Sequence, residues 1–270
     1  MWLPAGLIVL AFISLYPIIY AVINSLKTEP QSTVNPFWFT NWPLQWSNFL
    51  IAFETIWHAF FTSAIITSVS VVGIIALASL SGYAFARIPF PAKNVLFMII
   101  FGLLLVPGFL TLIPLFIEIK DFGLLDHDLG LILPYIAGGQ AFAIFVFRSF
   151  FSGLPDEIFE SAVMDGASDL TLYGRIVMPL SIPIMVTIAI INVVGIWGDY
   201  VLPSLVMNAT GHRTLAVAIV SFEAPKFAPS LNVYNIELAA YLLASIPLLF
   251  LFSFLMKYFI QGMTSGSIKM

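Results

Sequence analysis

The chain has 270 residues, of which 60% are hydrophobic and 9% charged, and its formal net charge is −4. A soluble domain carries roughly 25% charged residues, so a chain of this composition needs lipid, not a core of its own, to cover its apolar side chains. The absence of cysteine excludes a disulfide framework and thiol chemistry, and without a basic patch no nucleic-acid partner is expected.

Six apolar stretches are long enough to cross a bilayer. At about 1.5 Å per residue, about 20 helical residues cover a hydrocarbon core of roughly 30 Å. The first stretch lacks a basic leader and a small-residue cleavage site, so we expect an uncleaved helix. The sequence thus predicts a single transmembrane domain, an all-α polytopic membrane protein with six spans. The predicted spans are residues 2–23, 59–85, 95–119, 129–150, 180–207 and 236–260.

The connections between these spans differ in character. Residues 24–58 form a polar and aromatic segment that we expect outside, with tryptophans suited to a membrane–water interface. The third span contains Pro107 and Pro114, which are tolerated because neighbouring helices can satisfy the freed carbonyl groups. A second long external loop is expected at residues 208–235. The interfacial tryptophans are Trp38, Trp42, Trp46 and Trp57.

The most polar internal stretch, residues 154–183, predicts a helix–turn–helix outside the membrane. Pro155 suits the first turn of a helix, where its missing N–H is not needed. Gly166 can adopt the left-handed conformation that ends a helix, Ser168 is a good N-cap for a second one, and we expect Pro179 to end that second helix. An apolar stripe at helical spacing faces a partner surface. The stripe consists of Ile158, Phe159, Ala162 and Val163.

The same stretch carries a family motif. Glu160-Ser161-Ala162, three residues, Gly166, nine residues and then Ile176-Val177-Met178-Pro179 resemble the EAA motif of ABC importer permeases. Ser161 and Met178 depart mildly from the alanine and leucine of that motif. The resemblance implies that residues 154–179 form cytoplasmic coupling helices that dock into a cleft of an ATPase subunit; an ordinary amphipathic loop is the alternative. The implied coupling residues are Glu160, Ser161, Ala162, Asp165, Gly166, Arg175, Ile176 and Pro179.

Positive charge gives weak support for the orientation that this motif implies. With the motif inside, six of the ten Lys and Arg residues lie inside and four outside, a small bias in the direction of the positive-inside rule. The six are Arg87, Lys93, Arg148, Arg175, Lys257 and Lys269.

The fifth span contains polar residues that a bilayer would disfavour. Asn192 and Asp199 are seven positions apart, two helical turns, and we expect them on one helix face. A carboxylate at this depth normally faces the bundle interior or a wet cavity. The segment resembles a Trp-Asn-Glu-aromatic stretch of carbohydrate-type permeases, with Gly198 and Asp199 in place of Asn and Glu. Either a substrate pathway or a structural polar cluster explains the set Gln140, Asn192, Trp197, Asp199 and Tyr200.

The C-terminal tail, residues 261–270, carries a second resemblance. Its Gly-x-Thr-x-Gly-x-x-Lys pattern is similar to the end of the second permease subunit in the maltose-transporter class. There the tail reaches between the two ATPase subunits, which implies that role for Gly262, Thr264, Gly266 and Lys269. Composition alone would indicate a disordered terminus.

Catalytic motifs are missing from the sequence. It contains no Gly-x-x-x-x-Gly-Lys-Ser/Thr phosphate loop and no nucleophile elbow, and His58, His127 and His212 lack metal-ligand spacing. We therefore expect a non-enzymatic subunit without a cofactor of its own, with ATP and Mg bound by a partner ATPase.

Together these features predict half of the translocation pathway of a bacterial ABC importer for a sugar or oligosaccharide, in the plasma membrane. The implied partners are a homologous permease, two ATPase subunits, an extracellular or periplasmic solute-binding protein, the sugar and membrane lipid. The implied mechanism is alternating access driven by ATP. The alternative is a transporter driven by an ion gradient, for which Asp199, nearly alone as an intramembrane ionisable group, is thin support.

Overall fold

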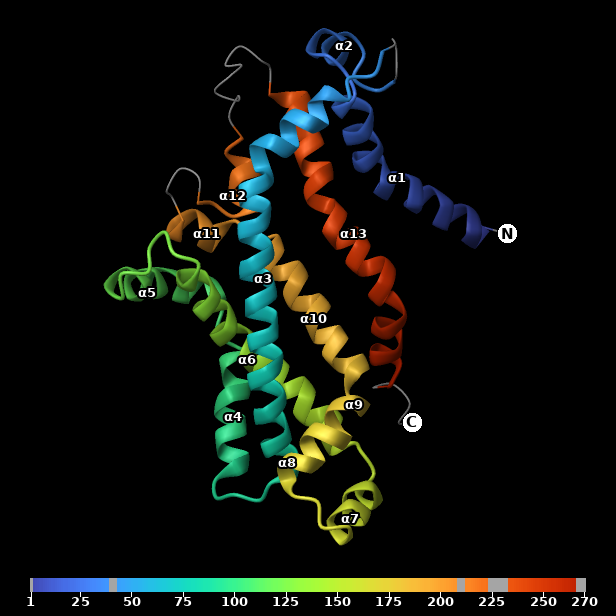
Figure 1. The fold of residues 1–270 in the computed structure, drawn as a ribbon. Coiled ribbons are helices and arrows are strands. Elements are labelled where there is room, and N and C mark those ends of the chain that lie inside the picture. The colour runs from blue at the N-terminus through green and yellow to red at the C-terminus, as the bar shows by residue number, and fades with distance from the viewer. Residues whose placement is uncertain (1, 39–42, 208–211, 223–232, 266–270) are drawn as a thin grey trace. The chain divides into compact units, whose positions relative to one another are not determined.

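The computed structural model describes residues 2–38, 43–207, 212–222 and 233–265, and all regular secondary structure in these ranges is helical (Figure 1). The chain forms two compact units. The first contains residues 1–62 and 210–249, and the second contains residues 63–209 and 250–270. Two long helices, α3 (Ser47–Arg87) and α13 (Tyr234–Ser265), each begin in the first unit and continue into the second.

Buried amide groups hold the first unit together. It contains α1 (Trp2–Ser25), α2 (Glu29–Val34) and α12 (Leu215–Val220) besides the starts of α3 and α13. The Nδ2 group of Asn235 donates to the Asn24 carbonyl at 2.6 Å and to the Ser32 hydroxyl at 2.5 Å, which joins α13 to α1 and α2. The buried Lys27 ammonium donates to the Asn35 carbonyl at 2.6 Å, and burial lowers the pKa of Lys27. This polar packing fixes the chain just beyond α1.

Helix α3 begins earlier than we expected. It starts at Ser47 instead of residue 59, and its 41 residues span about 60 Å, roughly twice the bilayer core. Its first turns bury Ala52, Ile56 and Ala59 at spacings of four and three residues, a helical pattern that the surrounding aromatic residues obscured. Trp46 and Trp57 are exposed, as is Trp38 in the segment before it, whereas Trp42 lies outside the described residues.

The third apolar stretch folds as two helices. Helix α4 (Lys93–Leu103) and helix α5 (Gly108–Asp121) meet at an angle of 94°. Pro107 is the N-cap of α5 and marks the break, whereas Pro114 lies inside α5 without interrupting it. Within the break, the N–H groups of Leu104 and Leu105 bond to carbonyls three residues earlier, both at 3.1 Å. The Leu103 carbonyl, to which Pro107 has no N–H to donate, accepts instead from the Val106 N–H at 3.2 Å.

The fifth apolar stretch is also interrupted. Helix α6 (Leu129–Ser152) is continuous, but residues 180–207 divide into α10 (Ile182–Trp197) and α11 (Val201–Val206).

Glycine residues allow α6 to pack closely against α3: a Cβ on Gly139 would lie 2.6 Å from Ile74 of α3. A Cβ on Gly82 would lie 2.6 Å from Phe147 of α6. Because any side chain at either glycine would clash, α3 and α6 approach each other closely.

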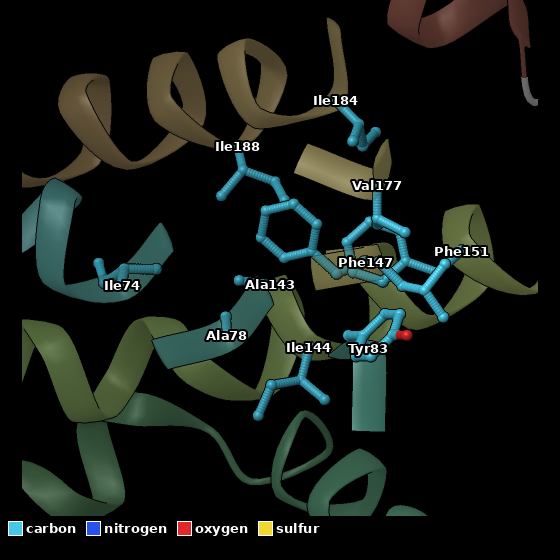
Figure 2. Close-up of a cluster of buried hydrophobic side chains, with 11 residues drawn as sticks. Ile74, Ala78, Tyr83, Ala143, Ile144, Phe147, Phe151, Val177, Ile184 and Ile188 are labelled. Carbon is cyan, nitrogen blue, oxygen red and sulfur yellow. The ribbon is translucent and has the colours of Figure 1, made fainter. Parts of the chain in front are cut away.

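One buried cluster joins α3, α6 and α10 in the second unit. Figure 2 shows Phe147 of α6 with Val177 and Ile188, all three fully buried. The rings of Phe147 and Phe151 stack with centroids 5.4 Å apart. Tight packing of this kind provides much of the association between membrane helices, because lipid supplies little hydrophobic driving force. The cluster also includes Leu172 and Val177, so the loop between α6 and α10 packs on the same core as the helices.

The helices have the length and apolarity needed to cross a membrane. Helices α3 and α6 and the Tyr234–Met256 part of α13 each suffice alone. Two bent pairs of helices can each count as one span: Lys93–Leu103 with Gly108–Asp121, and Asp169–Leu180 with Ile182–Trp197. A further apolar helix, Val9–Ser25 of α1, is shorter. Large apolar side chains such as Met98, Phe109 and Ile113 are more than 70% exposed, which suits contact with lipid.

Candidate functional site

The loop between α6 and α10 begins with α7 (Asp156–Met164), which ends as we predicted. Gly166 has φ +82°. The Ala167 N–H donates to the Ala162 carbonyl and the Gly166 N–H to the Val163 carbonyl, both at 2.9 Å. These two bonds define a Schellman motif, in which a left-handed residue satisfies the last carbonyls of a helix. Local chemistry therefore sets the turn after α7.

The second helical segment of the loop is longer than we expected. Ser168 caps α8 (Asp169–Leu172) by accepting from the Thr171 N–H at 3.3 Å, as predicted. The chain then continues through a π-helical segment, η1 (Tyr173–Val177), into α9 (Met178–Leu180). Our expectation that Pro179 ends the helix was wrong, because Pro179 lies within this continuous run.

The break comes at Ser181, two residues before Pro183, and bends the chain by 73°. A proline ring clashes with the carbonyl four residues earlier, so Pro183 does not allow a straight continuation from Pro179. The Ser181 hydroxyl donates to the Val177 carbonyl at 2.5 Å and so satisfies a backbone group at the bend. Pro183 thus sets the boundary that we had assigned to Pro179.

The apolar stripe of α7 does not all face outward. Phe159 and Ala162 pack against the buried cluster of the chain itself, whereas Val163 is 56% exposed. The expectation that the whole stripe faces a partner was therefore wrong for Phe159 and Ala162, which pack on the chain's own core, and for Val163 it stays a prediction. Two further large apolar side chains are exposed at the tip, Met164 at 87% and Leu170 at 78%. We call Val163, Met164 and Leu170 the apolar tip.

The predicted coupling residues lie along the same loop, from α7 to α9. Ala162 and Ile176 are partly buried against the cluster. Ser161 donates to the Ile158 carbonyl at 3.1 Å. The remaining predicted residues, Glu160, Asp165, Gly166, Arg175 and Pro179, are exposed. The loop therefore presents charged side chains of both signs beside exposed apolar ones.

Arg87, the last residue of α3, ties this loop to the helices, and sequence reasoning placed it only in a short turn. Its Nε and Nη2 groups donate to the Phe151 carbonyl at 3.1 and 2.8 Å, and Nη2 also donates to the Leu154 carbonyl at 2.5 Å. Its Nη1 group pairs with the Asp156 carboxylate, and its guanidinium lies 4.0 Å from the Phe159 ring centre. All four partners are at least 64 positions away in sequence, so no local pattern indicates them.

Asp199 lies outside the helix in which we had placed it. Helix α10 ends at Trp197, with Gly198 as C-cap, so the inference that Asn192 and Asp199 share one helix face was wrong. The Tyr135 hydroxyl donates to Asp199 Oδ2 at 2.7 Å, and the Val201 N–H donates to Oδ1 at 2.9 Å. Asp199 thereby links α6 to the start of α11. Tyr135 was missed because a tyrosine in an apolar span is usually a packing residue.

The other polar residues of the predicted pathway have partners in their own helices. The amide groups of Asn192 and Gln140 donate to the Ile188 and Ile136 carbonyls at 2.9 and 3.0 Å. Asn192 also approaches α6, since a Cβ on Gly139 would lie 3.1 Å from its Oδ1 atom. Trp197 is buried and Tyr200 exposed. The structure thus brings Asn192 and Asp199 onto α6 at Gly139 and Tyr135, one helical turn apart.

The tail residues are described only in part. Gly262 and Thr264 lie in the last turns of α13, which continues to Ser265. Gly266 and Lys269 lie outside the described residues. The interface role of the tail stays a prediction.

The curated relatives to which this chain is similar are permease proteins of uptake systems. The permease protein NgcG of the diacetylchitobiose uptake system of Streptomyces coelicolor is 26% identical over 98% of this chain and 87% of its own length. The melibiose/raffinose/stachyose import permease protein MelC of Bacillus subtilis is 30% identical over 94% of this chain and 91% of its own. A probable permease protein for starch degradation products, AmyC of Thermoanaerobacterium thermosulfurigenes, is 28% identical over 97% of this chain and 94% of its own.

A solved structure shares the fold. It is the crystal structure of a bacterial ABC transporter involved in the import of the acidic polysaccharide alginate, which superposes with a TM-score of 0.84 and 23% identity over 95% of this chain and 94% of that one. Residues 74–265 match the family described as binding-protein-dependent transport system inner membrane component. This matched range is more than half of the chain and contains the end of α3 and all of α4 to α13. The chain is therefore a multi-pass membrane protein of the binding-protein-dependent transport system inner membrane component family.

Proposed function

We propose that this chain is one permease subunit of a bacterial ABC importer for sugars or oligosaccharides, located in the plasma membrane. Family membership supports a role in transport that depends on a binding protein. The names of the relatives support the substrate class, since they refer to uptake of diacetylchitobiose, of starch degradation products and of melibiose, raffinose and stachyose. An ion-gradient transporter has no comparable support.

The observation that carries the coupling part of this proposal is the apolar tip of the α7–α8 loop. Val163 and Met164 are exposed although Phe159 and Ala162, also on α7, are packed inward, and Leu170 of α8 is exposed as well. An exposed apolar group beside charged residues is typical of a protein–protein contact. The proposed partner is a cytoplasmic ATPase subunit that binds ATP and Mg. A homologous permease would complete the membrane channel.

The mechanism follows from how the loop is attached. ATP-driven closure of the ATPase pair would move α7, and α7 rests on a buried cluster shared by α3, α6 and α10. Packed cores respond to such a displacement by shifting whole helices rather than by deforming locally. Movement of α7 would therefore reorient α6, which carries Tyr135, and α10, which Asp199 follows, and so change the Tyr135–Asp199 hydrogen bond. Sugar would enter from a solute-binding protein on the outer side.

Reconstitution tests this proposal. The chain is co-expressed with a homologous permease, an ATPase and a solute-binding protein from the same organism, purified through a tag on this chain and placed in proteoliposomes. We expect the ATPase to co-purify, and its hydrolysis to increase when the sugar-loaded binding protein is added. Sugar uptake that proceeds on an ion gradient without ATP would contradict the proposal.

The tail is a second proposed contact with the ATPase pair. Deleting residues 264–270 removes only the last two described residues of α13, so the subunit should still insert. We expect sugar uptake to fall or to lose its regulation, because the proposed contact between the two ATPase subunits is gone. Unchanged uptake and hydrolysis would show that the tail has no such role.

A further inference from the structure

At the end of α6, the Phe151 carbonyl lacks the donor that a continuing helix would supply, and Arg87 donates to it instead. In a continuing helix the Phe151 carbonyl would accept from the N–H of residue 155, but residue 155 is proline and has no N–H. The terminal carbonyls of a helix need donors from elsewhere. Besides the Leu154 N–H at 3.4 Å, two N–H groups of Arg87 donate to the Phe151 carbonyl, and a further one donates to the carbonyl of Leu154, which follows α6. The side chain of Arg87 is only 16% exposed, so these bonds are shielded from water.

The same guanidinium holds the first turn of α7. Asp156 and Phe159 are three residues apart and therefore lie on one face of α7. Arg87 pairs with the carboxylate of Asp156 and lies over the ring of Phe159. The planar fork of arginine can bind a carboxylate, carbonyl groups and an aromatic face at once, which a lysine ammonium does not do. Arg87 is thus one rigid connection between three elements, α3, α6 and α7.

A neighbouring arginine at the same end of the helices provides a contrast. Arg148 of α6 lies 3.6 Å from the Phe97 ring centre and donates to the Phe85 carbonyl at 3.3 Å. Among the described residues, the ring contact of Arg148 reaches α4 and its hydrogen bond reaches α3, and neither reaches α7 or α8. Both arginines combine a ring contact with a backbone carbonyl. Only Arg87 extends to the loop that carries the apolar tip.

We infer that Arg87 is a positioning residue that makes the inner end of α3 and the first turn of α7 move together during transport. The inference rests on the proposed coupling role of the loop. Because α3 is 41 residues long, a displacement of α7 by the ATPase is passed through Arg87 to a helix that spans the whole membrane. Without this connection, α7 can still bind the ATPase, but only the packing of Phe159 and Ala162 on the buried cluster links it to α3, so the two helices move together less closely.

The test compares Arg87→Lys with Arg148→Lys in the reconstituted complex. Lysine keeps the charge of Arg87 but cannot bind two carbonyls, a carboxylate and a ring together. We expect Arg87→Lys to insert, to co-purify with the ATPase and to keep its basal hydrolysis. Sugar-stimulated hydrolysis and uptake should fall by about tenfold, which is within the range known for residues that carry coupling between sites. Arg148→Lys should retain both activities.

A distance measurement tests the connection independently of ATP hydrolysis. The chain has no cysteine, so Leu80→Cys in α3 and Glu157→Cys in α7, both at exposed positions, provide two unique sites for spin labels, one on each of the two helices. In the assembled complex we expect a narrow distance distribution for the otherwise unchanged chain and for Arg148→Lys. Arg87→Lys should broaden it, because the first turn of α7 is no longer held.

The outcomes separate this inference from the proposed function. If Arg87→Lys keeps full stimulation and a narrow distribution, or if it alone loses the ATPase on purification, the inference is wrong. If the unchanged chain never binds an ATPase, the proposed function fails instead. A broadened distribution in Arg87→Lys would then still support the connection between α3 and α7.

Discussion

Arg87 and Asp199 are both ionisable residues beside an interruption in a helix, yet their hydrogen bonding differs. Arg87 directs three bonds to backbone carbonyls and one to a carboxylate. Asp199 accepts one bond from the Tyr135 hydroxyl and one from the Val201 N–H. An ionised carboxylate has about four acceptor positions. Arg87 is therefore largely occupied by the fold, whereas Asp199 retains capacity to accept hydrogen bonds from sugar hydroxyl groups.

This difference indicates a division of roles within the second unit. At the α6–α7 junction, the donors of Arg87 are bonded within the protein, and the apolar tip at the other end of α7 is exposed. This arrangement suits binding to a protein partner whose movement is passed on to the helices. At the α10–α11 junction, the Asp199 carboxylate can accept more hydrogen bonds than it receives, and the next residue, Tyr200, is exposed. This arrangement suits reversible contact with a polar solute. The predictions below test this division.

The largest effect is expected at the turn after α7. Gly166→Val places a β-branched residue at φ +82°, at a cost of roughly 1–2 kcal/mol, so the subunit should still insert. The turn would relax by changing the angle between α7 and α8. Because a displacement of about 1 Å can reduce an activity by about 100-fold, sugar-stimulated hydrolysis should be nearly lost.

Gly102→Val is the matched control for Gly166. Gly102 lies in α4, where a Cβ would have no atom within 4 Å, and its φ is not in the left-handed region. This variant should keep normal hydrolysis. If Gly166→Val also retains full ATPase recovery and stimulation, the loop is not the coupling site.

A smaller effect is expected at Asp199. Asp199→Asn keeps the shape of the side chain but removes its charge. If sugar hydroxyls bind this carboxylate, uptake should fall by about tenfold, which corresponds to losing one hydrogen bond to a charged group, while the complex remains assembled. Uptake of radiolabelled sugar at several concentrations measures the change.

Tyr135→Phe sharpens the result for Asp199. It removes the hydroxyl donor but leaves the carboxylate charged, so uptake should change less than in Asp199→Asn. If instead Tyr135→Phe is the more damaging variant, or if Asp199→Asn transports normally, the pair is a structural link between α6 and α11.

How far the sequence predicted each region depends on the distance between the interacting residues. The turn at Gly166 and the cap at Ser168 were predicted because both depend on hydrogen bonds between residues no more than five positions apart. The roles of Arg87 and Tyr135 were not predicted, since their partners are 64 or more positions away. The shared face of Asn192 and Asp199 failed because the periodicity argument assumed a helix that continues past Gly198.

The six apolar stretches and the all-helical fold were predictable because hydropathy acts over whole segments. The breaks within them were not all predictable. Pro107 interrupts the α4–α5 pair and Pro114 does not, although both occur in one apolar stretch. Pro183 acts on the bend at Ser181, whereas Pro179 is accommodated after a π-helical segment. A proline indicates that one backbone carbonyl of the helix needs another hydrogen-bond donor, but tertiary packing decides where the helix breaks.

The smallest effect is expected at Asp156. Its side chain is 78% exposed, and exposed ion pairs contribute little to stability. Asp156→Asn alone should therefore lower sugar-stimulated hydrolysis by only about twofold, because the carbonyls and the Phe159 ring still hold Arg87. In the double variant Arg87→Lys with Asp156→Asn, the loss should equal that of Arg87→Lys alone, since Asp156 acts through Arg87 and residues in one network are not additive. The measurement is a double-mutant cycle on stimulated hydrolysis in proteoliposomes. Additive losses would mean that Asp156 contacts the ATPase directly, and the α6–α7 junction would then belong to the docking surface instead of to the helices behind it.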